Sequence, residues 1–105
     1  MKEKKTGIER IAAERKRQIE EEGFTANHDD ENSHGEMACA AACYAMPTFR
    51  RYITTERQVF VLDAIWYWDR EWWKPTPDNR IRELEKAGAL IAAEIDRLIR
   101  LEEKK

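Results

Sequence analysis

One run of ten residues, 37–46, constrains the fold of this chain more than any other feature, because it is apolar on every side. A helix without a polar face has to be enclosed by other elements, so the run predicts a helix buried at the centre of the fold. Ser33 and Glu36 fit a capping box before it, and Pro47 cannot continue a helix. We therefore expect a central helix that begins near Ser33 and ends before Pro47.

Capping signals place a first helix over about residues 6–22. Thr6 and Glu9 have the spacing of a capping box, in which each side chain satisfies a free backbone N–H at the helix start. Gly23 is a natural stop just past the last turn. The residues that recur at three- and four-residue steps, and so share one face, are Ile8, Ile11, Ala12, Arg15 and Ile19.

Residues 48–68 allow two interpretations. Thr55 and Gln58 are placed to cap a helix, whereas the β-branched and aromatic side chains on both sides of them favour strands. We prefer a helix here, and the alternative is a short hairpin within 49–66 that turns near Thr55.

The last helix is predicted to begin at Thr76, with Pro77 in the first helical position and Asp78 in the first turn. A heptad-like stripe follows, made of Ile81, Leu84, Gly88, Ile91, Ile95 and Leu98. A helix that continues to about Leu101 is ~36 Å long, which exceeds what a globule of this size needs. We expect its overhang, or a second stripe through Leu90 and Leu101, to meet another subunit of a homo-oligomer.

These elements predict one all-α domain over residues 1–105, a small bundle of three to four helices with frayed ends at 1–5 and 102–105. The 19 Lys and Arg residues nearly balance the 21 Asp and Glu residues, which argues against a nucleic-acid binder held by a basic face.

Membrane and export signals are missing from the sequence. No apolar run approaches the ~20 residues of a membrane span, and a charged pattern stands where a signal peptide would have its apolar core. Two cysteines without an export signal indicate reduced thiols in a cytoplasm. We expect Cys39 and Cys43 to pack in the core as small apolar side chains rather than to bind zinc.

A loop rich in turn-forming residues, 24–32, contains the densest polar cluster, with His28 at its centre. Three or four carboxylates brought to one point would bind Mg²⁺, and the metal would neutralise a pyrophosphate and activate water. The carboxylates placed for this are Glu22, Asp29, Asp30 and Glu36. The alternative is that these acids only form turns and helix caps.

Four tryptophans fall within residues 66–73, more than one small core normally absorbs. Trp72 and Trp73 are followed by Lys74, and an aromatic face beside a cation suits stacking on a base while the phosphate is paired. The alternative is that these rings seal the core or a subunit interface.

Arg15 lies on the apolar face of the first helix, so we expect it to be partly buried beside an opposite charge. Its expected partner is Asp29, Asp30 or Glu36, and a ligand phosphate is the alternative.

The chain contains the motifs HDD at 28–30, WWKP at 72–75 and KAGALI at 86–91. Further stretches of interest are 14–19, 22–24, 35–36, 40–45, 66–69 and 94–95. In these motifs and stretches, the sequence resembles a family of small proteins of phages and prophages. The resemblance implies a phage-type protein that works inside a bacterial cytoplasm. The chain is also similar, at a lower level, to MazG-type nucleotide pyrophosphohydrolases and to ryanodine-receptor repeat domains, which look like ligand- or partner-binding modules.

Three functions are expected on these grounds. The first is a non-catalytic module that binds a nucleotide-like anion, and in a phage it would sequester a host signalling nucleotide and so antagonise host defence. The residues expected to bind this ligand are Arg15, His28, Asp29, Asp30, Glu36, Trp72, Trp73 and Lys74. The second is a pyrophosphohydrolase with Mg²⁺ as cofactor, and the third is a protein-binding inhibitor or a structural oligomer.

Overall fold

The computed structural model describes residues 4–104, so the predicted fraying of residues 1–3 and 105 lies outside the described part. Its elements are α1 (Gly7–Glu21), α2 (Ala26–Glu31), α3 (Glu36–Ala45), α4 (Thr48–Arg51), α5 (Val61–Ile65), the 3-10 turn η1 (Arg70–Trp72) and α6 (Arg80–Glu103). The predicted all-α fold with a long C-terminal helix is confirmed. In the described part, no helix is long and apolar enough to cross a membrane.

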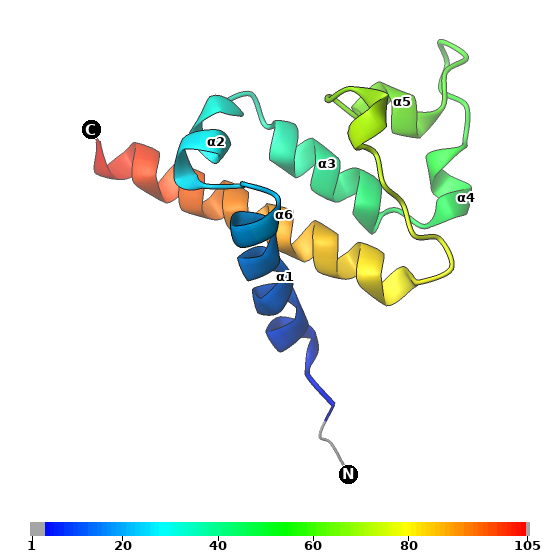
Figure 1. Cartoon of the computed structure of the whole chain (residues 1–105). Coiled ribbons are helices and arrows are strands. Elements are labelled where there is room, and N and C mark those ends of the chain that lie inside the picture. Colours follow the sequence, from blue (N-terminus) through cyan, green and yellow to red (C-terminus); the bar gives the residue numbers. More distant parts are fainter. Residues whose placement is uncertain (1–3, 105) are drawn as a thin grey trace.

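The core lies between α3 and α6, which run alongside each other, while α1 crosses α6 near its middle (Figure 1). The buried side chains of these two helices include Met37, Ala40, Ala41, Cys43 and Tyr44 from α3 and Ala87, Leu90 and Ala93 from α6. Small alanine side chains on both helices allow close approach of the two backbones. The predicted central helix, its end before Pro47 and the core position of Cys43 are confirmed.

Helix α1 has the predicted start and stop but buries a different face. Thr6 and Glu9 form the capping box, and Gly23 adopts a positive φ of 74°. However, Ile8 is 82% exposed, and the buried residues of α1 are Glu14 and Gln18. The apolar stripe is therefore the wrong guide to burial here, because Glu14 forms a 2.6 Å ion pair with Arg82 of α6.

The predicted start of the central helix is wrong, and one short helix was not predicted. Helix α3 is capped by Gly35 in the left-handed region, and the Glu36 carboxylate accepts from the backbone N–H of His34 at 2.6 Å, with no capping box to Ser33. A short helix, α2, replaces the predicted loop and begins after Thr25.

Helix α6 begins three residues later than predicted, after Asn79. The reason is that the backbone N–H of Thr76 donates to the Glu83 carboxylate at 3.0 Å, which holds residues 76–79 outside the helix. At its other end α6 continues through Glu103, two residues past the predicted end near Leu101.

Between α4 and α5 the chain forms a narrow turn instead of the preferred helix. Thr54 and Phe60 form an antiparallel bridge, and the N–H of Thr55 donates to the carbonyl of Val59 at 2.7 Å. Gln58 takes a positive φ of 62° at the tip. The hairpin alternative is confirmed for this turn, and helix is limited to α4 and α5 on either side.

Candidate functional site

A cavity of about 350 Å³ opens between α1, α2, α3, α6 and the tryptophan-rich segment 66–74. Its size is in the range of small-molecule sites. Most of its wall is aromatic or aliphatic, from Phe24, His28, Tyr44, Trp66, Trp68, Trp72 and Leu90. The charged and polar lining residues are Glu14, Arg17, Gln18, Glu22, Lys74 and Lys86.

The aromatic wall is held in place by contacts among its own rings. Trp66 meets Trp68 edge to face at 5.6 Å between ring centroids, and the Phe24 and His28 rings are stacked at 4.5 Å. The indole N–H of Trp68 donates to Asn32 at 3.0 Å, which fixes that ring against α2. In contrast, Trp72 is 57% exposed, so its side chain is accessible to a ligand.

The positive charges of the site differ in whether they are neutralised. Arg17 is held by Glu14 at 2.8 Å and by Glu22 at 2.9 Å. Lys74 and Lys86, by contrast, form no ion pair with any carboxylate of residues 4–104. Because neither ammonium group is held in an ion pair within the described chain, both charges can attract an anion.

Lys86 is the more constrained of these two lysines. Its Nζ donates to the backbone carbonyl of Lys74 at 2.9 Å and lies 5.4 Å from the centre of the Tyr44 ring. Burial, together with the nearby charge of Arg82, lowers the pKa of the Lys86 ammonium below its ordinary value. A negative ligand would reverse that effect by stabilising the protonated form.

Gln18 supplies an acceptor that nothing in the described chain uses. Its side chain is 3% exposed, its Nε2 donates to Glu14 at 3.3 Å, and its Oε1 has no hydrogen-bond partner. The Glu14 carboxylate accepts only, so it fixes which end of the amide carries the nitrogen. The unsatisfied oxygen therefore calls for a donor, such as the N–H of a ligand.

The residues predicted from the tryptophan-rich segment divide between the cavity and the core. Trp72 and Lys74 line the cavity, whereas Trp73 does not. The Trp73 ring packs 4.7 Å from Tyr44 and lies under the guanidinium of Arg51 at 5.0 Å. The predicted stacking role for Trp73 therefore has no geometric basis, and the core alternative describes this ring.

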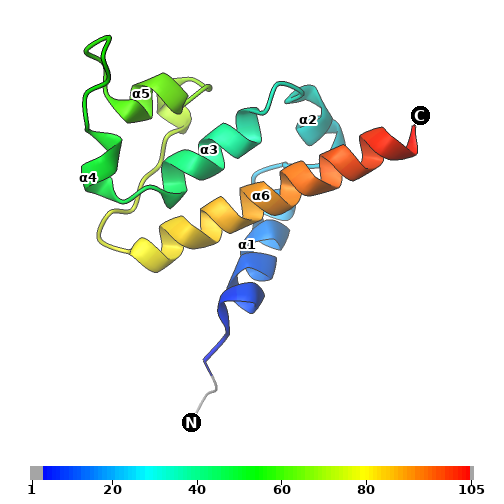
Figure 2. The same ribbon diagram turned by 180° about the vertical axis from the view of Figure 1, so that it is seen from behind.

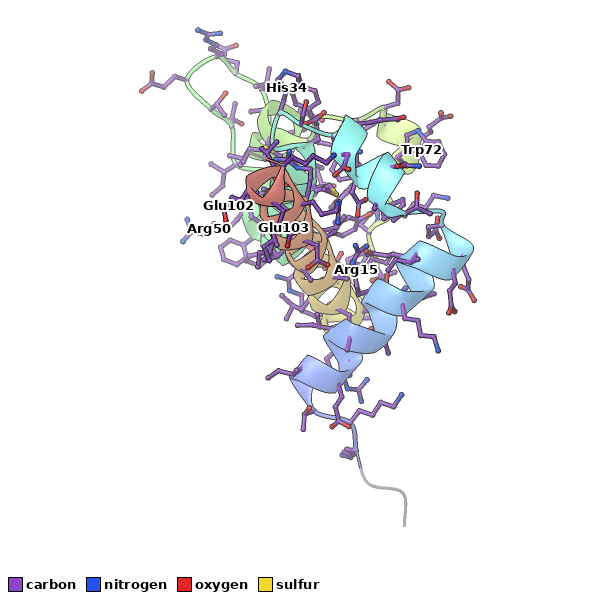
Figure 3. All side chains as sticks on the ribbon, turned by 90° about the vertical axis from the view of Figure 1, so that its left-hand side faces the viewer. Arg15, His34, Arg50, Trp72, Glu102 and Glu103 are labelled. Carbon is purple, nitrogen blue, oxygen red and sulfur yellow. The ribbon has the colours of Figure 1, made fainter. Side chains whose placement is uncertain are left out.

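Arg15 has the predicted acidic partner and points away from the cavity. Its Nη2 lies 3.1 Å from the fully buried Asp29 carboxylate and 3.8 Å from Asp96 on α6. Figure 3 shows Arg15 between α1 and α6, clearly separated from Trp72 at the rim of the molecule. Arg15 and Asp29 thus stabilise the junction of α1, α2 and α6 and do not reach the cavity.

The remaining predicted acids lie apart. Asp30 pairs with Arg100 at 2.8 Å, Glu36 accepts from His34, and Glu22 stands at the cavity beside Arg17. His28 also reaches the cavity, and its Nδ1 lies 2.9 Å from Asp29. Within residues 4–104, no three His, Cys, Asp or Glu side chains gather as they would to hold a metal ion.

Sequence reasoning missed Gln18, Tyr44 and Lys86 as site residues. Lys86 lies one turn before the core residue Leu90. That spacing is the available signal, because residues four apart share a helix face. Gln18 follows the buried Glu14 by the same interval.

Comparisons with protein-family models, with curated proteins and with solved structures gave no match to this chain.

Proposed function

We propose that this cavity binds a flat, anionic ligand of the nucleotide class and holds it without turning it over. The observation that carries the proposal is the meeting of an aromatic wall with two ammonium groups, Lys74 and Lys86, that have no carboxylate partner in the described chain. A nucleotide has matching parts, because its base stacks on rings and its phosphate pairs with cations.

The base is expected to occupy the aromatic end of the cavity. Trp72 is exposed there, while Trp66 and Trp68 form the fixed part of the wall. An amino or imino N–H of the base would satisfy the orphan Oε1 of Gln18. Giving that buried acceptor a hydrogen-bond donor contributes on the order of 1–3 kcal/mol to the binding free energy.

Binding without turnover is supported by the state of the two carboxylates in the cavity. Glu14 and Glu22 are both held in ion pairs with Arg17, and Glu14 has a second partner in Arg82. Groups held in this way are poor general bases. A ligand that is bound but not converted is sequestered, which is the role we propose for the protein.

The test is a titration of the full chain with adenosine, guanosine, cytidine and uridine monophosphates, each beside its parent nucleoside, in EDTA and in Mg²⁺. Heat of binding and the thermal unfolding midpoint are both measured. A ligand at 100 times its Kd adds ~2.7 kcal/mol, which shifts the midpoint by several degrees. We expect a monophosphate to bind in EDTA, with its nucleoside at least ~10-fold weaker because the ammonium contacts are lost.

Matched variants show whether the cavity is responsible. Trp72→Ala and Lys86→Met should weaken binding ~10-fold or more, while Tyr67→Ala, in the same segment, exposed and outside the cavity, should leave it unchanged. Release of pyrophosphate from a nucleoside triphosphate in Mg²⁺ would instead support the hydrolase. Absence of binding to every nucleotide would overturn the proposal.

A further inference from the structure

Helix α6 has one apolar face that stays largely exposed in the described chain, with Ile11 of α1 covering it at Gly88. Six aliphatic side chains along it are each between 44% and 58% exposed, and we name them the α6 face: Ile81, Leu84, Ile91, Ile95, Leu98 and Ile99. Figure 2 shows α6 across the front of the molecule with no other ribbon over it. Single exposed aliphatic residues are ordinary, but six on one helix face mark an interaction surface.

The α6 face holds the aliphatic bulk that a core of this size would normally contain. No isoleucine among residues 4–104 is buried, and four of them lie on the α6 face. The core instead consists mainly of alanines and rings, with Met37, Leu62 and Leu90 as its larger aliphatic members. Isoleucine is among the residues most often buried in folded proteins, so the α6 face has the composition of a covered surface.

The shape of the single chain also indicates a missing layer. Its radius of gyration is 14.9 Å, whereas a compact domain of this length has ~13 Å. Its shortest dimension is 21 Å, which corresponds to two layers of helices at ~10 Å each. α6 is therefore an outer layer on the side where its apolar face lies.

We propose that a second copy of this chain packs its own α6 face against this one through a two-fold axis. The steps of three and four residues along the face are those of a helix packed against a like helix. Gly88 has no side chain to contribute to this face. The side chain of Ile11, from α1, lies directly over that glycine and takes the place of an aliphatic residue there. None of the six side chains is charged, so packing them against their copies buries no charge of their own.

The area of the α6 face agrees with a second copy of the chain as its partner. Six half-exposed aliphatic side chains and their immediate neighbours offer on the order of 600–800 Å² per copy, which matches the ~800 Å² that each partner buries in a stable interface. Helix α6 contributes Lys86 and Leu90 to the nucleotide cavity, and neither belongs to the α6 face, so dimerisation and ligand binding are tested separately.

The first experiment is sedimentation equilibrium of the full chain from about 1 to about 100 μM. We expect a monomer–dimer equilibrium. Ile91→Glu should raise the dimer dissociation constant at least ~100-fold, tenfold for each of the two carboxylates that the dimer would bury. Val59→Glu is the matched control, because Val59 is equally exposed but lies in the turn between α4 and α5.

Cross-linking gives an independent measurement. Ile91 lies near the middle of the face, so a two-fold axis brings it close to its counterpart whichever way the helices run. In a Cys39→Ala background, Ile91→Cys should form a disulfide-linked dimer on oxidation, and Val59→Cys should not. Far-ultraviolet circular dichroism checks that each variant stays helical. If Ile91→Glu loses its helical structure, Leu98→Ala replaces it as a milder variant of the same face. A wild-type chain that stays monomeric at the highest concentration overturns the proposal, as does an unchanged dimer in the Ile91→Glu variant.

Discussion

Arg51 and Glu83 form an ion pair almost entirely hidden from solvent, with 3.1 Å between Nη1 and Oε2. The same guanidinium donates from Nε to the Cys43 carbonyl at 2.9 Å and from Nη2 to the Tyr44 carbonyl at 3.1 Å. These carbonyls are among the last of α3, where helical partners run out. One side chain of α4 thus caps the end of α3 and ties it to the start of α6.

Replacing Arg51 should therefore destabilise the fold strongly. Arg51→Ala breaks the buried ion pair and leaves the Cys43 carbonyl without its side-chain donor, while Arg80 still reaches Glu83 and the Tyr44 carbonyl. We therefore expect a loss of about 3 kcal/mol, the low end for a broken buried ion pair. Arg51→Lys keeps the charge but cannot serve three acceptors in different directions, so a loss of ~1–3 kcal/mol is expected. Urea unfolding followed by tryptophan fluorescence measures both. Arg50→Ala is the control, and it should cost under ~0.5 kcal/mol because its guanidinium contacts only the exposed Phe49 ring.

Acid should destabilise the protein through its buried carboxylates. Burial alone would raise the pKa of Glu14, but hydrogen bonds from Arg17 and Arg82 outweigh it and hold that pKa below the ordinary 4.5. The pKa of Glu83 is likewise lowered, because the hydrogen bonds from Arg51 and Arg80 exceed the effect of burial. Since the folded pKa values lie below the unfolded ones, this stability is complete above the unfolded pKa and is lost as pH falls through the folded pKa.

The urea midpoint should accordingly change little between about pH 7 and pH 5 and fall below about pH 4.5. Glu14→Gln should lower the midpoint at neutral pH and make its fall in acid less steep. A midpoint that rises on acidification would contradict this account of the two glutamates.

Much of the fold was predictable because local chemistry decides it. The capping box of Thr6 and Glu9, the all-apolar α3 and the stop at Pro47 need no partner from elsewhere in the chain. The errors occur where an interaction with a residue far along the chain outweighs the local capping or periodicity signal. The start of α6 moves because Glu83 takes the N–H of Thr76, and Glu14 is buried because Arg82 approaches from another helix.

Gly88 allows α1 to cross α6 closely. A Cβ at this position would lie 2.5 Å from Cδ1 and 2.7 Å from Cγ1 of Ile11. Because a β-branched side chain such as that of Ile11 has little rotamer freedom, α1 would have to move. We expect Gly88→Ala to lower the free energy of unfolding by ~1–2 kcal/mol, a net value that includes the higher helix propensity of alanine.

A double-mutant cycle tests that steric cause. In an Ile11→Ala background the clash is gone, so Gly88→Ala should become neutral or stabilising by up to ~1 kcal/mol. The same loss in both backgrounds would show that the Ile11 contact is not the reason for the glycine.

Affinity for adenosine monophosphate should fall in alkaline solution as Lys86 loses its proton. Burial lowers the pKa of this lysine below 10.5, and the neutral amine no longer attracts phosphate. Loss of one charged hydrogen bond predicts a roughly tenfold weaker Kd. Lys86→Arg keeps its charge across the range and leaves Lys74 as the lysine of the site, so calorimetry should give it a shallower profile than the wild type. An equally steep profile would exclude Lys86 as the titrating group.

The candidate site was predictable only in part, since it is assembled from separate elements. Trp72 and Lys74 are neighbours in the chain, and their chemistry is visible there. Gln18 and Lys86 reach the cavity only because α1 crosses α6. Asp29 was one of the predicted partners of Arg15. This ion pair stabilises the junction of helices, so neither residue is free to bind a ligand in the cavity.

The ring contacts of the cavity wall have an optical consequence. Trp66 lies 5.6 Å from Trp68 and 5.1 Å from Trp73, both at steep angles, so the electronic transitions of the three indoles couple as an exciton. The native protein should therefore show an indole couplet in its ultraviolet circular dichroism that disappears when these rings separate. That signal reports on the packing of the cavity wall without any attached label.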